Sequence, residues 1–153
     1  MALHFPHSHP PAAGELTEVV PGVFWLRMPL PFQLDHINLW LLRDGNGWVI
    51  IDTGFPEDHV RETWSLILDR LDGPVNKLVV THFHPDHLGL ATWLMEKTGA
   101  RLWMSTGEFL TAHVVWNEVG GHGARFMVEQ FRQHGLDAEQ LAKFERRGSG
   151  YRK

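Results

Sequence analysis

Four side chains that can bind metal ions lie within six consecutive residues of this 153-residue chain. They are His82, His84, Asp86 and His87, in the pattern His-x-His-x-Asp-His. Because residues two apart in an extended strand point to the same side, His82 and His84 can converge on one ion. A turn after His84 brings Asp86 and His87 beside them, which supplies ligands for one ion or for two neighbouring ions. The pattern predicts a metal site that activates water for hydrolysis.

The types of ligand restrict the choice of metal. The chain contains no cysteine, which excludes disulfide bonds, thiolate ligands and a cysteine nucleophile. We therefore expect Zn²⁺, one or two ions, with Fe or Mn as alternatives because imidazole and carboxylate ligands accept them too. The competing interpretation is a solvated loop in which Asp86 or Thr81 caps a following helix. Crowding three histidines and one aspartate together is unfavourable without a bound ion, which favours the metal site.

Short apolar segments typical of β-strands surround the cluster. They are residues 23–26, 37–42, 48–51, 77–80 and 101–104, and the strand pattern begins at Leu16. The glycine-containing turn at residues 44–47 predicts a hairpin between the second and third segments. The fourth segment leads directly into the histidine cluster.

Helical patterns separate the later strands. One helix is opened by residues 56–58 and stopped by residues 72–74. Its apolar positions fall on one face: Val60, Trp64, Ile67, Leu68 and Leu71. A second helix is expected from residue 85 to about residue 97. Beyond Thr106 the sequence is mainly helical, with segments at 124–134 and 137–146. This order predicts an α/β fold with a mixed sheet.

Two motifs together resemble the metallo-β-lactamase superfamily, in particular its glyoxalase II-like hydrolases. A strand ends in Asp-Thr-Gly at residues 52–54, and after a helix another strand ends in Thr-His-Phe-His-Pro-Asp-His-Leu-Gly at residues 81–89. The resemblance implies these roles: first-metal ligands His82 and His84, second-metal ligands Asp86 and His87, and a supporting carboxylate, Asp52. It also implies that Asp86 is catalytic, orienting the nucleophile or taking its proton. Taken alone, Asp52 has the alternative role of a helix N-cap.

The resemblance covers only the N-terminal half of such a domain. Members of the superfamily fold as a four-layer αββα sandwich of two similar halves, and the second half supplies two further histidines and a bridging aspartate. Those motifs are not evident here, and the remaining candidates are His113, His122 and His134. We expect a partly buried structural role for His113, a glycine-rich connection around His122, and a helix-end position for His134. The predicted fold is half of the sandwich, with helices on one face of the sheet and a helical C-terminal region.

The ends and the composition complete the expectations. Residues 1–14 are predicted to be a disordered tail rich in His and Pro, and residues 15–153 the N-terminal part of the domain. No segment approaches the roughly 18 apolar residues of a membrane helix, and no signal peptide is recognisable, so we expect a cytoplasmic protein without membrane association. An exposed sheet face in half a sandwich predicts a homodimer.

The net charge indicates which class of substrate to expect. A charge of −4 provides no broad basic field for a phosphate backbone, so we expect a small-molecule substrate and no nucleic acid. The leading prediction is a metal-dependent hydrolase of a small ester, thioester or lactone. The alternatives are a truncated, non-catalytic half-domain with an incomplete metal site, and a phosphodiesterase or nuclease of the same superfamily.

Overall fold

The computed structural model describes residue 3, residues 6–121 and residues 123–147. The chain divides into two compact units, Met1–Met104 and Ser105–Lys153, and each is described by itself. The described residues form six strands and six helices, and all six strands belong to the first unit. The predicted metal ligands also belong to the first unit, so this unit positions the site.

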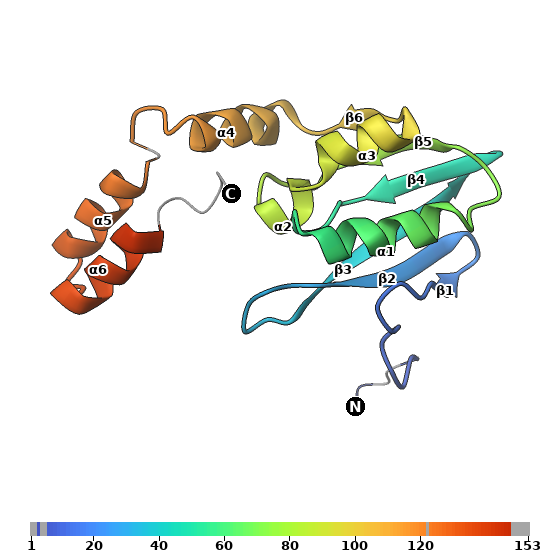
Figure 1. Ribbon diagram of the computed structural model, residues 1–153, viewed down its shortest axis with the longest axis horizontal. Helices are drawn as coiled ribbons and strands as arrows, with labels where there is room; N and C mark the ends of the chain where they lie inside the picture. The colour runs from blue at the N-terminus through green and yellow to red at the C-terminus, as the bar shows by residue number, and fades with distance from the viewer. Residues whose placement is uncertain (1–2, 4–5, 122, 148–153) are drawn as a thin grey trace. The chain divides into compact units, whose positions relative to one another are not determined.

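One mixed sheet forms the frame of the first unit, with its strands side by side in chain order (Figure 1). The strands are β1 (Thr17–Val20), β2 (Val23–Pro29), β3 (His36–Asp44), β4 (Gly47–Ile51), β5 (Val75–Val79) and β6 (Arg101–Trp103). Strands β1 to β4 are antiparallel, whereas β5 runs parallel to both β4 and β6. Parallel neighbours need a crossover, and helices provide it here. The predicted mixed sheet is confirmed.

The β3–β4 hairpin sets the position of the first site residue. Asp44 pairs with Gly47, so the turn consists of Gly45 and Asn46, as the sequence predicted. Gly45 has a φ of 61°, a conformation that such tight turns require and that glycine adopts without strain. The hairpin register ends β4 at Ile51, directly before Asp52.

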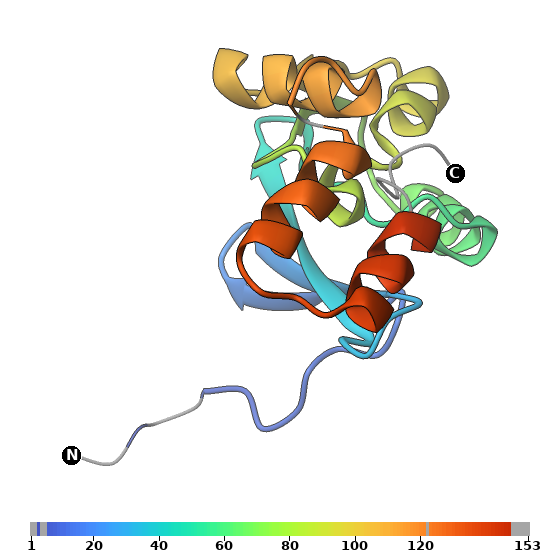
Figure 2. The same cartoon turned by 90° about the vertical axis from the view of Figure 1, so that its left-hand side faces the viewer.

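Helices α1 (Asp58–Leu68) and α3 (Ala91–Thr98) cover one face of the sheet (Figure 2). The core between them contains side chains with no exposed surface: Leu26, Leu39, Leu41, Ile50, Val60, Trp64, Ile67, Leu78 and Leu94. The predicted apolar face of α1 is confirmed, with Leu68 and Leu71 partly buried against the core. Helix α1 begins two residues later than Pro56, because Glu57 is its extended N-cap residue. The fully buried core makes the sheet and helices a rigid support.

The opposite face of the sheet carries its own apolar row. The strand registers place Trp25 beside Trp40, Trp40 beside Ile51, Ile51 beside Val79, and Val79 beside Trp103. Trp103 is 55% exposed at the edge strand. A sheet that is apolar on both faces is typical of an internal layer, which agrees with the predicted half of a sandwich.

The helix expected from residue 85 to about residue 97 is interrupted, and that prediction was wrong. The structure has a short helix α2 (Pro85–Leu88) and then α3, with Gly89 and Leu90 between them. The Leu90 N–H would bond the carbonyl four residues earlier in a continuous helix. It instead bonds the Thr53 hydroxyl at 3.0 Å, and this contact ends the first helix.

The second unit is helical, as predicted. It contains α4 (Thr106–Trp116), α5 (Ala124–Gln133) and α6 (Ala138–Arg147). The Ser105 hydroxyl accepts a hydrogen bond from the Glu108 N–H and caps α4. Helices α5 and α6 pack through Phe131 and Phe144, whose ring centroids are 4.9 Å apart. Within the described ranges, no helix combines the length and the apolar character that a membrane span requires.

The end of the predicted tail lies against the first unit. Pro11 is buried, and Ala13 forms a single bridge with Arg27 of β2. The Arg70 guanidinium donates to the Gly14 carbonyl at 2.7 Å. These contacts attach residues 11–14 to β2 and to the turn that follows α1.

Candidate metal centre

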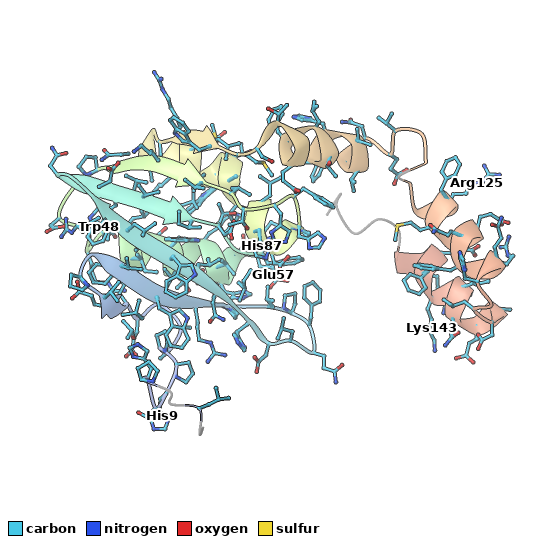
Figure 3. The ribbon with its side chains drawn as sticks, turned by 180° about the vertical axis from the view of Figure 1, so that it is seen from behind. His9, Trp48, Glu57, His87, Arg125 and Lys143 are labelled. Carbon is cyan, nitrogen blue, oxygen red and sulfur yellow. The ribbon has the colours of Figure 1, made fainter. Side chains whose placement is uncertain are left out.

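The predicted ligands and Asp52 come from the ends of two neighbouring parallel strands. Asp52 directly follows β4, and the segment from Thr81 to His87 follows β5. The Asp52 N–H still donates to the Val79 carbonyl at 2.8 Å, so strand pairing continues to this point. Because parallel strands end at the same edge of a sheet, residues 29 to 35 positions apart meet here. The labelled His87 lies at this edge (Figure 3).

Asp52 is a buried acceptor of three hydrogen bonds. Oδ1 accepts from the Thr81 N–H at 2.7 Å, and Oδ2 accepts from the Thr81 hydroxyl and from Nδ1 of His87, both at 2.8 Å. The residue is only 5% exposed, and the backbone has a φ of 63°. A non-glycine residue in this left-handed conformation is strained and is typical of functional sites. The alternative role of Asp52 as a helix N-cap is wrong, because Glu57 occupies that position in α1.

Thr81 extends the network to His82. Its hydroxyl donates to Asp52, so it can accept a hydrogen bond from Nδ1 of His82, which lies 3.0 Å away. The protons are assigned from this network. With Nδ1 of both His82 and His87 used in hydrogen bonds, Nε2 is the ring nitrogen left for a metal. A carboxylate or hydroxyl behind each imidazole is the usual arrangement for metal-binding histidines.

The predicted ligands form one cluster. The ring centroid of His82 lies 3.8 Å from that of His87 and 4.7 Å from that of His84. Asp86 joins through Oδ2, which is 3.6 Å from Nε2 of His87. The competing interpretation of a helix cap is wrong, since α2 has His84 at its N-cap position and no side-chain cap hydrogen bond.

The electrostatics of the cluster favour a neutral His82 ring and an ionised Asp52 carboxylate. Burial and the neighbouring His87 and His84 lower the pKa of His82 below its usual 6.5. Burial by itself raises the pKa of Asp52, but hydrogen bonds from His87 and Thr81 outweigh it and lower that pKa below 3.8. Metal ligands must be unprotonated imidazoles, so these shifts prepare the site for an ion near neutral pH.

The types of ligand at the cluster fit a divalent metal, but the side chains are not arranged around a common point. Across residues 6–121 and 123–147, no three His, Asp or Glu side chains are arranged to hold an ion. Two rings with centroids 3.8 Å apart and planes at 48° lie against each other instead of directing their nitrogens to one point. Three imidazoles and a carboxylate at one strand edge are nevertheless the ligand types that zinc, iron and manganese accept.

The three remaining candidate histidines, His113, His122 and His134, belong to the second unit. His113 is exposed on α4 and packs edge-on against Phe109 with centroids 4.5 Å apart, so the prediction that it is partly buried was wrong. His134 is exposed at the C-cap of α5, where the sequence placed it. His122 lies outside the described residues.

Sequence reasoning assigned no role to Thr53 and considered Thr81 only as a possible helix cap. Thr53 follows Asp52 and Thr81 precedes His82, and the hydroxyl of each donates to a group of the cluster. Threonine is common in strands, and its partners here are up to 37 positions away. The presence of a threonine in each motif was the only signal in the sequence. Its hydrogen-bond partner could not be predicted, because that partner depends on which strands pair.

The comparisons with known proteins agree with this geometry. A sequence profile of the metallo-beta-lactamase superfamily matches residues 33–137, which include the β3–β4 hairpin, Asp52 and the histidine cluster. The chain belongs to the metallo-β-lactamase superfamily. Members of this superfamily are generally metal-dependent hydrolases that bind zinc or other divalent metals. None of the curated proteins compared with the chain matches it.

Solved structures extend the likeness to most of this chain. A beta-lactamase domain protein from Burkholderia ambifaria is 48% identical with a TM-score of 0.71, over 84% of this chain and 39% of that protein. A metallo-beta-lactamase family protein from Thermus thermophilus is 31% identical with a TM-score of 0.65, over 82% and 42%. A metallo-beta-lactamase from Pontibacter korlensis is 24% identical with a TM-score of 0.55, over 65% and 46%, and supports the fold alone. The chain thus corresponds to less than half the length of these proteins.

Proposed function

We propose that this chain binds a divalent metal, Zn²⁺ first, through His82, His84, Asp86 and His87, and contributes to hydrolysis of a small ester, thioester or lactone. One observation carries the proposal: Asp52 and Thr81 hold Nδ1 of His87 and His82, and Nε2 of both rings remains for a metal. Buried polar groups are seldom committed to orienting two adjacent imidazoles in a purely structural loop.

Each residue has a defined task in this proposal. When bound, the ion supplies Lewis acidity and a water of lowered pKa. Asp52 fixes the His87 ring and balances charge from a buried position. Asp86 is 25% exposed in its side chain, so its carboxylate is accessible to a proton from the attacking water.

The small acyl substrate is inferred from charge and from the kind of site. The net charge of −4 disfavours a nucleic-acid backbone as substrate. A metal centre with one accessible carboxylate suits attack on a polarised carbonyl, which esters, thioesters and lactones share. Substrate choice in such folds depends on loops outside the cluster.

The test begins with metal stoichiometry. The full chain with His4, His7 and His9 replaced by alanine, here called the tail-substituted chain, removes adventitious binding by the N-terminal segment. Elemental mass spectrometry after zinc loading and dialysis should find at least one ion per chain. His84→Ala in this background should lose it, whereas the matched control His134→Ala, an exposed helix-end residue, should keep it.

Hydrolysis is measured on the same samples. Ester, thioester and lactone probes should be cleaved in a manner that zinc restores after chelation. Equal metal content in the His84→Ala and parent chains would overturn the metal assignment. Metal binding without turnover would overturn the catalytic part of the proposal and assign the activity to a longer protein that contains this chain.

A further inference from the structure

Thr53 is a fully buried polar residue whose hydrogen-bonding groups all have partners. Its N–H and its hydroxyl both donate to the His87 carbonyl, each at 2.8 Å. The same hydroxyl accepts from the Leu90 N–H at 3.0 Å. Its carbonyl accepts from Nε1 of Trp64 on α1 at 2.7 Å. Thr53 therefore links β4, α1 and the end of α2.

Two consecutive residues hold the two ends of His87. Asp52 accepts a hydrogen bond from the ring at Nδ1, and Thr53 donates two hydrogen bonds to the backbone carbonyl. Because the side chain is fixed at one end and the main chain at the other, both the place and the direction of Nε2 are determined. A ring held only through Nδ1 could still shift along with its backbone.

The hydroxyl of Thr53 also determines where α2 ends. By accepting from the Leu90 N–H it replaces the helical hydrogen bond that would continue α2 into α3. His87 therefore lies in the last turn of a four-residue helix. A longer helix would alter the backbone that carries its ring.

The segments around Thr53 and His87 approach each other closely at two glycines. A Cβ on Gly89 would lie 2.2 Å from the Pro85 carbonyl oxygen and 3.1 Å from the Gly54 carbonyl oxygen. A Cβ on Gly54, which has a φ of 89°, would lie 2.9 Å from Val60. The two glycines let the segments around Thr53 and His87 approach closely enough for the hydrogen bonds to form.

We propose that Thr53 is a positioning residue for the metal centre, acting through the His87 carbonyl and the Leu90 N–H to fix the backbone that carries the His87 ring. The inference rests on the proposed function and goes beyond it, since Thr53 itself offers no group to the metal. Groups behind metal ligands typically change metal affinity by 10- to 100-fold when they are removed.

The test compares three variants of the tail-substituted chain. Thr53→Val keeps the shape and removes the hydroxyl, and Thr53→Ser restores it. Thr98→Val is the matched control, because the Thr98 hydroxyl also bridges a carbonyl and an N–H, those of Leu94 at 2.6 Å and Ala100 at 3.2 Å. Each variant is titrated with Zn²⁺ against a chromophoric chelator, and its ¹⁵N-labelled histidine rings are observed by NMR without metal.

Thr53→Val should weaken zinc binding by about 10- to 100-fold and shift the His87 ring nitrogen signals, while Thr53→Ser and Thr98→Val stay near the parent. Unchanged affinity in Thr53→Val, or an equal loss in Thr98→Val, would overturn the positioning role. If the parent chain binds no zinc, the proposed function fails. The metal-free NMR then decides on Thr53: a shift of the His87 signals that is specific to Thr53→Val supports its effect on the ring, and no shift overturns it.

Discussion

Replacing Asp52 by asparagine tests the site at its centre while keeping the shape of the side chain. In the structure, Oδ1 accepts from the Thr81 N–H, and Oδ2 accepts from the Thr81 hydroxyl and from Nδ1 of His87. An asparagine oxygen can keep the first bond, but its NH₂ group then faces the other two donors. The Thr81 hydroxyl can rotate to accept. His87 can accept only by moving its proton from Nδ1 to Nε2.

The size of the effect follows from these bonds. A protonated Nε2 cannot bind a metal, so zinc affinity should fall by about 100-fold, the upper end of the range for a group behind a metal ligand. All three charge-assisted hydrogen bonds become neutral ones, a loss of about 1 kcal/mol each. Since Asp52 is 5% exposed, solvent screening reduces this little, and the metal-free protein should lose about 3 kcal/mol.

Three measurements on Asp52→Asn check the reasoning. Chelator competition gives the zinc affinity, urea unfolding gives the stability of the metal-free chain, and ¹⁵N NMR gives the tautomer of His87. The control is Asp44→Asn, whose carboxylate forms a half-exposed ion pair with Lys77 at 2.8 Å. It should keep its zinc affinity and lose less stability than Asp52→Asn does, because exposed ion pairs contribute little.

A variant that binds zinc within about threefold of the parent would contradict the argument. So would a His87 ring that keeps its proton on Nδ1, because the predicted loss depends on the tautomer. A loss of affinity with an unchanged tautomer would show instead that the charge of Asp52 is what matters.

Three further outcomes are expected. Thr81→Val should weaken zinc binding by about 10-fold, whereas Thr111→Val, on exposed α4, should not; equal affinities would refute this. Gly89→Ala should cost about 1–3 kcal/mol in urea unfolding, because its Cβ would lie 2.2 Å from the Pro85 carbonyl oxygen. Burial raises the pKa of Asp52, but its hydrogen bonds lower this pKa by more, so the folded carboxyl has a lower pKa than the unfolded one. The metal-free chain should therefore lose stability as pH falls below about 3.9, and Asp52→Asn should lose less over the same range. Parallel curves of stability against pH would contradict this.

The sequence was sufficient for the parts of the site that are local. Four ligand-type residues within six positions need only a strand end and a turn to meet, and the structure brings them together. The hairpin at residues 44–47 and the apolar face of α1 are also local patterns, and both are confirmed. Asp52 could be placed near the cluster only by resemblance, because its contact with His87 spans 35 positions.

The parts that could not be predicted depend on contacts between distant segments. Periodicity favoured one helix from residue 85 to about residue 97, since nothing in that segment shows that the Leu90 N–H is used by Thr53. Helix α1 begins at Asp58 and not at Pro56, because Glu57 before it has an extended backbone. His113 is exposed, and the sequence of α4 does not show which of its faces is covered.

The parallel pairing of β4 with β5 also has a consequence for the order of folding. The hydrogen bond between Asp52 and His87 closes a segment of 35 residues that includes all of α1. Closing a segment of that length is entropically unfavourable until burial of α1 compensates for it. In refolding kinetics, high-affinity zinc capture should therefore develop together with burial of Trp64 and not before it. The metal centre would then be a late product of folding and would not nucleate it.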